Sequence, residues 1–196
     1  MKKIGITGSI GSGKTTVCRI FEMLGVPVYY ADAAGKKLME INQNLKNALV
    51  ENFGKKIISD EKINHRTLAE IVFKKNDSLQ MLNALVHPLV FEDFENWCMM
   101  HVRKKYVLME AAILFESGAE NFLDAVITVT APEKIRLERI LHRGSETEEQ
   151  FRLRQQNQRS EQEKAKRADF IIVNDEKTLV IPQVLNIHRE IALWKK

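Results

Sequence analysis

The chain has 196 residues, of which 44% are hydrophobic and 29% are charged, and its formal net charge is +4. This length and composition exclude a disordered chain and predict one domain with a full core and room for inserted subdomains. The charge is too small to indicate nucleic-acid binding by itself, and no apolar run approaches the ~20 residues that a membrane span needs.

The first predicted element is the strand KKIGIT, Lys2–Thr7. Because this strand begins so close to the first residue, no room remains for a signal peptide, and we expect a cytoplasmic protein without a membrane or nucleic-acid partner. Cys18 and Cys98 are isolated and show no C-x-x-C spacing, so we expect reduced structural thiols rather than a disulfide or a zinc site. The sequence gives no indication of an oligomeric state.

The stretch after this strand, GSIGSGKT at residues 8–15, matches the phosphate-binding loop (P-loop) pattern G-x-x-x-x-G-K-[ST], and a helical pattern follows it. Its glycines allow positive φ and a close approach of backbone N–H groups to anionic oxygens: Gly8, Gly11 and Gly13. The helix N-terminus adds free donors, Lys14 can reach the β and γ phosphates, and Thr15 can offer a hydroxyl to Mg²⁺. A dinucleotide motif would need glycine at Thr16, so a nucleoside triphosphate is the favoured ligand.

The remaining elements alternate between strands and helices. A short strand, Val28–Tyr30, precedes Asp32, and a helical stretch then extends to about residue 105, with a break at NFGKKIISD and a proline at Pro88. Further buried strands are predicted at YVLMEAAILF, DAVITVT and DFIIVN, with helices at 132–143 and 179–194. This alternation predicts a three-layer α/β fold with a parallel sheet. Ligands of such sheets bind beyond the carboxyl ends of the strands, where the P-loop and Asp32 both fall.

The segment from Lys134 to Arg167 is basic, with ten lysines and arginines against six glutamates. Arg139 and Arg143 lie four residues apart on one side of a predicted helix, where guanidinium groups can stabilise the charge of a phosphoryl transition state. The stretch Arg143–Arg167 has few apolar anchors, which predicts a mobile helical lid. The alternative is an exposed helix pair without a role.

Three classes of P-loop protein compete: a small-molecule kinase, a GTP switch and a nucleic-acid-dependent ATPase. DAAG at 32–35 has the D-x-x-G form of GTP switches, but the region of their guanine-selecting N-K-x-D element reads NDEK at 174–177. The third class usually has a strongly acidic strand end, and YVLMEA offers only Glu110. A kinase needs a group that accepts the hydroxyl proton, and Asp32 can do this; its alternative role is the N-cap of the next helix.

Several motifs together are specific to one family. They are GITGSIGSGKTTV at 5–17, AD at 31–32, NHRTLAEIVF at 64–73, LVHPLV at 85–90, ILFESG at 113–118, RLERILHR at 136–143 and KRADFIIVN at 166–174. Along nearly its full length the chain resembles the dephospho-CoA kinase family of P-loop kinases. The resemblance implies ATP-dependent phosphorylation of the ribose 3′-hydroxyl of dephospho-CoA, giving CoA and ADP in the last step of CoA biosynthesis. The alternative is another small-molecule or nucleoside monophosphate kinase of the same group.

The resemblance also implies a division into three parts. The chain would have a nucleotide-binding core with a five-stranded parallel sheet at 1–31, 106–142 and 168–196, a helical CoA-binding domain at 32–105 and a lid at 143–167. Asp32 would be the catalytic base, assisted by Lys14 and Arg143, and Thr15 would contact Mg²⁺. The implied ATP-binding residues are Gly11, Ser12, Gly13, Lys14, Thr15, Thr16, Arg139 and Asn174. The implied acceptor-binding residues are Asp32, Arg66, His87 and Glu116.

The acceptor-side residues also have structural interpretations. Beside Pro88, His87 can cap or bend a helix, Arg66 can form a surface ion pair, and Glu116 can be a carboxylate at a helix start.

The chain departs from the family pattern at three positions. Tyr30 stands where the family has an aspartate, Ala112 where it has a proline, and Arg136 where it commonly has a glutamine. Because Asp32, Lys14 and Thr15 are intact, we expect an active enzyme.

Overall fold

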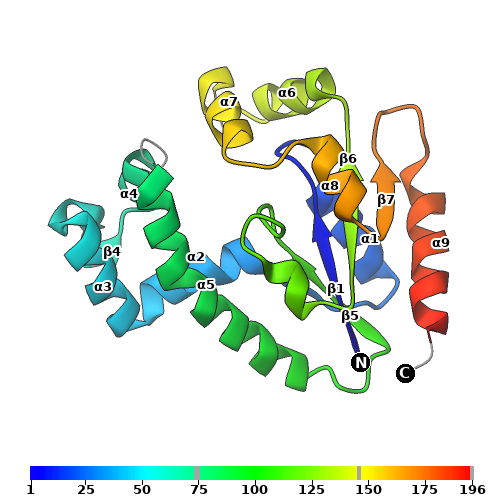
Figure 1. Cartoon of the computed structure of the whole chain (residues 1–196), viewed down its shortest axis with the longest axis horizontal. Helices are drawn as coiled ribbons and strands as arrows, with labels where there is room; N and C mark the ends of the chain where they lie inside the picture. Colours follow the sequence, from blue (N-terminus) through cyan, green and yellow to red (C-terminus); the bar gives the residue numbers. More distant parts are fainter. Residues whose placement is uncertain (73–75, 145–146, 195–196) are drawn as a thin grey trace. The chain divides into compact units, whose positions relative to one another are not determined.

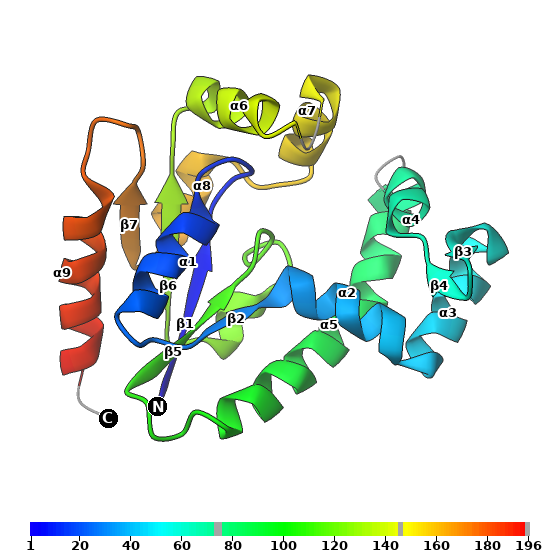
Figure 2. The same ribbon diagram turned by 180° about the vertical axis from the view of Figure 1, so that it is seen from behind.

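The computed structural model describes residues 1–72, 76–144 and 147–194. The chain forms two compact units, each of which is described by itself (Figures 1 and 2). The sheet unit contains Met1–Tyr30 and Met100–Lys196, and the helical unit contains Ala31–Met99. No helix within the described ranges is both long and apolar enough to cross a membrane.

The sheet unit is built on a five-stranded parallel sheet with the strand order β2-β5-β1-β6-β7. Its strands are β1 (Lys2–Thr7), β2 (Val28–Tyr30), β5 (Tyr106–Glu110), β6 (Ala125–Thr130) and β7 (Phe170–Val173). Ile6 of β1 lies between Glu110 and Ile127 of the neighbouring strands. The predicted parallel α/β fold is therefore confirmed, and β1 in the centre of the sheet leads directly into residues 8–15.

The predicted strand at 106–115 was too long. β5 ends at Glu110, and residues 112–118 form turns before the short 3₁₀ helix η2 (Ala119–Phe122). One residue beyond β5, the backbone N–H of Ala111 donates to the carbonyl of Ile6 in β1. Beyond this bond, the carbonyl of Ala112 accepts side-chain donors, including Lys164 Nζ at 3.1 Å, so the strand ladder cannot continue through it.

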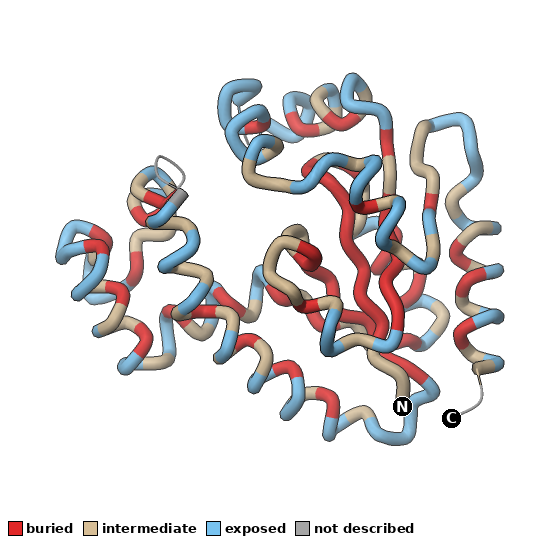
Figure 3. Tube along the Cα trace, viewed as in Figure 1, coloured by how far each residue is buried: buried red, intermediate tan, exposed pale blue. Residues whose placement is uncertain are grey.

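Helices α1 (Lys14–Met23) and α9 (Val180–Leu193) pack on one face of the sheet, and α8 (Glu161–Arg167) lies on the other (Figures 1 and 2). Strands β5 and β6 are buried on both faces, as parallel strands usually are, whereas the edge strand β7 exposes Ile171 (Figure 3). The buried side of α1 carries Val17, Cys18 and Phe21. These side chains share one core with β1, β5, β6 and the apolar side of α9.

In its described residues, the basic segment contains the helices α6 (Glu133–His142), α7 (Glu148–Gln156) and α8. Capping boxes begin α7 at Thr147 and α8 at Ser160, because each hydroxyl and the third helical residue bond reciprocally. Phe151 of α7 is fully buried against Ile10 and Ile140, so the segment has an apolar anchor. Residues 145–146 of the predicted lid lie outside the described residues, and movement of the segment stays a prediction.

The helical unit contains α2 (Ala31–Ile41), α3 (Gln43–Phe53), α4 (His65–Val72) and α5 (Asn76–Met99). The break predicted at NFGKKIISD is the end of α3 at Gly54, followed by the 3₁₀ helix η1 (Lys55–Ile57) and an antiparallel hairpin of β3 (Ile58–Ser59) and β4 (Lys62–Ile63). Sequence analysis missed this hairpin, in which Asp60 and Glu61 have positive φ. The motif residue Phe73 lies outside the described residues.

Pro88 does not interrupt α5 but lies inside it. Buried side chains continue along the helix at four-residue spacing on both sides of the proline: Val86, Val90, Phe94 and Cys98. A Cβ added to Gly35 of α2 would lie 3.4 Å from Val86 and 3.5 Å from Val90, so the absent side chain permits close packing of α2 on α5. This continuous apolar stripe offsets the hydrogen bond that proline cannot donate.

Phe21→Ala tests the core beneath residues 8–15. Phe21 is 0% exposed, so its truncation should lower the free energy of unfolding by about 3 to 5 kcal/mol through lost burial and the resulting cavity. Met23→Ala is the matched control, because Met23 is 77% exposed on the same helix and its loss should change little. Urea unfolding measures both, and equal effects of the two substitutions would contradict this assignment of the core.

Candidate active site

The P-loop lies between the end of β1 and the start of α1, as the sequence predicts. Its glycines Gly8, Gly11 and Gly13 have φ values of 153°, 79° and 93°. A Cβ on Gly11 would lie 2.6 Å from the carbonyl oxygen of Arg136, so this position has neither the backbone conformation nor the space for a side chain. Lys14 folds back over the loop, and its Nζ donates to the carbonyl of Gly8 at 2.9 Å.

The N-terminus of α1 has no side-chain cap. Gly13 occupies the N-cap position in the left-handed conformation, and no cap hydrogen bond from a side chain of the described residues is present. Thr15 and Thr16 are exposed in the first turn. Such a terminus, with its positive dipole end and unpaired donors, suits an anion.

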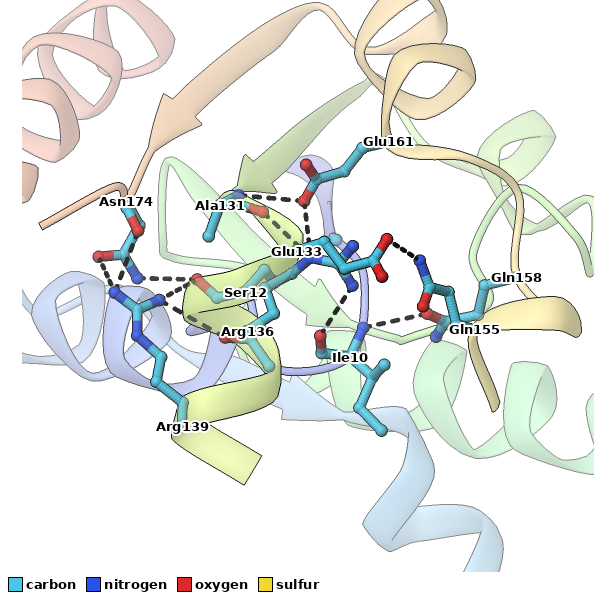
Figure 4. Close-up of polar contacts among 12 residues, drawn as sticks. Ile10, Ser12, Ala131, Glu133, Arg136, Arg139, Gln155, Gln158, Glu161 and Asn174 are labelled. Atoms are coloured by element: carbon cyan, nitrogen blue, oxygen red, sulfur yellow. Dashed lines mark hydrogen bonds and ion pairs between the residues drawn. The ribbon is translucent and has the colours of Figure 1, made fainter. Parts of the chain in front are cut away.

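Arg139 and Asn174 are brought to this loop from two distant elements (Figure 4). Asn174 follows β7, and its Nδ2 donates to the carbonyl of Ser12 at 2.7 Å. Arg139 of α6 lies 3.4 Å from the same carbonyl through Nη1, and its Nη2 donates to the carbonyl of Asn174 at 3.1 Å. Arg139 also pairs with Glu176 at 3.2 Å. The two predicted nucleotide contacts therefore border the P-loop side by side.

Arg143 is not brought to the P-loop by any contact of its own. It lies at the C-terminal cap of α6 with an exposed side chain, and the structure gives its guanidinium no hydrogen-bond or ion-pair partner within the described ranges. Its proposed catalytic role therefore stays a prediction.

Glu116 lies in the turn after β5, so it does not begin a helix. Its Oε1 accepts from the backbone N–H of Arg159 at 2.6 Å and lies 3.2 Å from Nζ of Lys164. Lys164 is 0% exposed and was missed by sequence analysis, because nothing in the local pattern of α8 distinguishes it from the exposed lysine two residues later. Burial lowers the pKa of Lys164, the Glu116 carboxylate raises it, and the charge of Lys14 lowers it further.

In the helical unit, Asp32 and His87 lie on α2 and α5, and the charge of Asp32 affects the pKa of His87. Asp32 is the second residue of α2 and is exposed, so it does not occupy the N-cap position. His87 lies on α5, where burial lowers its pKa and the charge of Asp32 opposes that shift. The side chain of Arg66 on α4 is 89% exposed and forms an ion pair with Glu70 at 3.3 Å. This surface ion pair is the structural interpretation given above for Arg66, and its proposed role in acceptor binding stays a prediction.

Tyr30 and Ala112 are two of the positions at which the sequence departs from the resemblance. Tyr30 ends β2 opposite Glu110 and packs against the main core, so a phenol stands where the resemblance implies an aspartate. Ala112 contributes its carbonyl oxygen, which accepts from Lys164 and Gln158.

The parallel sheet, the P-loop at the carboxyl end of its central strand and the open N-terminus of α1 define a P-loop kinase fold. A shikimate kinase from Acinetobacter baumannii has the same fold, with a TM-score of 0.56 over 97% of this chain and 93% of that one at 15% identity.

The dephospho-CoA kinase family model matches residues 2–179, and the chain belongs to this family. It is a kinase with ATP as co-substrate, and its family catalyses the final step of CoA biosynthesis.

Relatives support the assignment over nearly the whole chain. A dephospho-CoA kinase from Bacteroides fragilis is 37% identical over 94% of this chain and 90% of its own length. One from Salinibacter ruber is 40% identical over 89% of both chains. The structure of a dephospho-CoA kinase from Campylobacter jejuni has a TM-score of 0.69 at 27% identity, covering 97% of this chain and 96% of that one. A Thermus thermophilus crystal structure reaches 0.82 at 30% identity, covering 97% and 95%.

Glu116→Gln tests the buried ion pair. Without the carboxylate charge, the pKa of Lys164 should fall further below the ordinary lysine value of 10.5. The free energy of unfolding should drop by about 2 kcal/mol at pH 7, since an uncompensated buried cation is costly. The pKa of Lys164 is lower in the folded variant than in the unfolded chain, so the unfolded chain binds the proton more tightly. The loss of stability should therefore shrink as pH rises through the pKa of Lys164 in the folded protein, and it should be small at pH 10.

Urea unfolding at pH 7 and pH 10 measures this difference. The control is Glu148→Gln, which breaks an exposed pair with Arg152 and should change little at either pH. An equal loss at both pH values would show that the charge of Lys164 is not the cause.

Proposed function

We propose that this chain transfers the γ-phosphoryl group of ATP to the ribose 3′-hydroxyl of dephospho-CoA, giving CoA and ADP, with Mg²⁺ and in the cytoplasm. The observation that carries the proposal is a P-loop that leads into the uncapped N-terminus of α1, in a chain that belongs to this family. ATP and dephospho-CoA are small molecules, and the proposal needs no nucleic-acid or membrane partner.

The proposed phosphate site is the second half of the P-loop together with the residue after it: Gly11, Ser12, Gly13, Lys14, Thr15 and Thr16. Its positive-φ glycines and uncapped helix start can direct backbone N–H groups toward phosphate oxygens. The amine of Lys14, which donates to Gly8 within the loop, is already positioned above it and can exchange that carbonyl for a β or γ oxygen. Such contacts neutralise the charge that spreads over the phosphoryl oxygens during transfer.

Thr15 fits a Mg²⁺ ligand, because its exposed hydroxyl lies in the first turn of α1 and magnesium prefers oxygen donors. Among the described residues, no group of three or more histidines, cysteines and acids could hold a metal. This suits an ion that takes most of its ligands from phosphates and water. When bound, Mg²⁺ would offset negative charge on the phosphates.

A pocket beside the P-loop suits the adenine ring. It has a volume of about 550 Å³ and a largely apolar lining of Thr16, Val17, Ile20, Asn174 and residues 179–182. Apolar walls with a few polar groups are typical of sites for flat aromatic ligands. Arg139 and Asn174, which share the carbonyl of Ser12, would border the ATP between the phosphates and this pocket.

Asp32 is the proposed base. It is the second residue after the carboxyl end of β2, and its carboxylate is exposed; ligands of parallel sheets bind beyond such strand ends. The hydroxyl proton would pass to this carboxylate as the oxygen attacks the γ phosphorus and the bond to the β-phosphate oxygen breaks. Arg143 is proposed to assist from the lid with its uncommitted guanidinium.

The acceptor is proposed to bind through Arg66, His87 and Glu116 together with Asp32. Asp32 and His87 lie on the contacting helices α2 and α5, and the effect of the Asp32 charge on the pKa of His87 supports a polar site on the helical unit. Glu116 supports the proposal through its Oε2, which is buried and has no hydrogen-bond partner among the described residues. In this assignment residues 32–105 form the CoA-binding domain, 143–167 the lid, and 1–31, 106–142 and 168–196 the nucleotide-binding core.

Asp32→Asn should lower kcat by about 100-fold or more and change the Kd for ATP by less than about threefold, because only the proton acceptor is lost. Asp77→Asn is the matched control, since Asp77 also lies in the first turn of a helix and is exposed. Steady-state kinetics and calorimetric ATP titration measure the two quantities. Unchanged turnover in the Asp32 variant would remove it as the base.

A panel of acceptors tests the substrate. With ATP and Mg²⁺, the enzyme should consume dephospho-CoA and form a 3′-phosphorylated product, while nucleoside monophosphates and gluconate should remain unchanged. ADP release and mass spectrometry of the products measure the outcome. Consumption of another acceptor in place of dephospho-CoA would favour the alternative of a different P-loop kinase, and no turnover at all would indicate binding without catalysis.

A further inference from the structure

Ile10 of the P-loop contacts the segment that contains α6, α7 and α8 through its side chain, its N–H group and its carbonyl, and Figure 4 shows the two polar contacts. Its side chain is 9% exposed and packs with Ile140 and Phe151. Its backbone N–H donates to Oε1 of Gln158 at 3.0 Å, and its carbonyl accepts from Nη1 of Arg136 at 3.2 Å. Both polar groups of this loop residue are therefore bound by side chains far away in the sequence.

Arg136 is a rigid part of this arrangement. It is 4% exposed, and its Nε donates to the carbonyl of Ala131 at 3.0 Å and lies 3.6 Å from Glu161 of α8. The guanidinium also lies over the ring of Phe151, 5.6 Å from its centroid. A buried cation must keep such partners, because losing one leaves an uncompensated charge. Arg136 therefore fixes the carbonyl side of Ile10.

Gln158 fixes the other side and is more accessible. It lies between α7 and α8 and is only partly buried. While its Oε1 accepts from Ile10, its Nε2 donates to the carbonyl of Ala112 at 3.3 Å, just beyond β5. One amide group thus joins the P-loop to the end of the neighbouring strand.

We propose that Gln158 is a positioning residue for ATP binding, which holds the peptide between Ser9 and Ile10 in the orientation that the anion-binding loop requires. The carbonyl of this peptide, that of Ser9, accepts from the backbone N–H of Ser12 at 3.0 Å, so Gln158 holds the N–H side. Without Gln158 the peptide would rotate more freely, and the N–H groups of the following residues would lose part of the arrangement in which they face a phosphate. Because the contact comes from the segment 147–167, ATP affinity and the seating of this segment on the P-loop are linked, and each favours the other. This proposal rests on one part of the proposed function, the binding of ATP to the P-loop, and does not depend on the identity of the acceptor.

The test compares Gln158→Leu with Gln155→Leu. Leucine has a similar size but cannot accept from Ile10 or donate to Ala112. Gln155 is the matched control, because it lies three residues earlier in the same segment and its Nε2 donates to the surface carboxylate of Glu133 at 2.8 Å. Calorimetry with Mg²⁺ and ATP, without an acceptor, should show a Kd about fivefold to tenfold higher for Gln158→Leu, which corresponds to about one net hydrogen bond. Gln155→Leu should stay within about twofold.

Two further readouts separate positioning from general loosening of the fold. In Gln158→Leu, KM for ATP should rise with Kd while KM for dephospho-CoA stays unchanged, and amide hydrogen exchange in residues 8–13 should become faster. An ATP Kd within about twofold of the parent would overturn the proposal. An equal loss in Gln155→Leu, or an equal rise of both KM values, would also overturn it. Because ATP affinity is measured without an acceptor, a different acceptor alcohol would refute the proposed function and leave this result intact.

Discussion

The close approach of the P-loop to α6 is the constraint on which the site depends. The backbone of Gly11 lies so near the carbonyl of Arg136 that no side chain fits, and the same arginine returns its guanidinium to Ile10 and Ala131. This contact fixes the loop between the central strand and a helix that follows the next strand along the sheet. Phosphate recognition by backbone groups needs such support, because N–H donors act only when their directions are fixed.

In the sheet unit, the buried cations Arg136 and Lys164 each stabilise a different loop. Arg136 binds the P-loop side, and Lys164 binds the carbonyl of Ala112 and the carboxylate of Glu116. Each charge lies in a low-dielectric interior, where backbone carbonyls and one carboxylate replace the water that it has lost. The basic segment therefore has two kinds of cation: buried ones that hold the loops in place and exposed ones, such as Arg143, that are available to a ligand.

Sequence patterns predicted the parallel sheet and the P-loop because strand, glycine loop and helix are adjacent in the chain. They overestimated the strand from Tyr106, because its end depends on side-chain donors from distant residues. They missed the hairpin at 58–63, because its strands have two residues each and its turn places Asp60 and Glu61, rather than glycines, at positive φ. The network around Ile10 was also invisible, since Gln158 contacts it across 148 positions of sequence. Of the residues implied by resemblance, Arg139 and Asn174 border the P-loop, whereas the roles of Asp32, Arg66 and His87 require substrate to be tested.

Cys18 illustrates a consequence of building a phosphate site on a core helix. It lies one turn after Lys14, yet its thiol is fully buried, and burial raises its pKa well above the usual range. The thiolate that alkylating agents and oxidants attack is therefore scarce and shielded. A protein whose proposed product carries a reactive thiol can work among thiols and disulfides without its own nucleotide helix becoming a target of exchange.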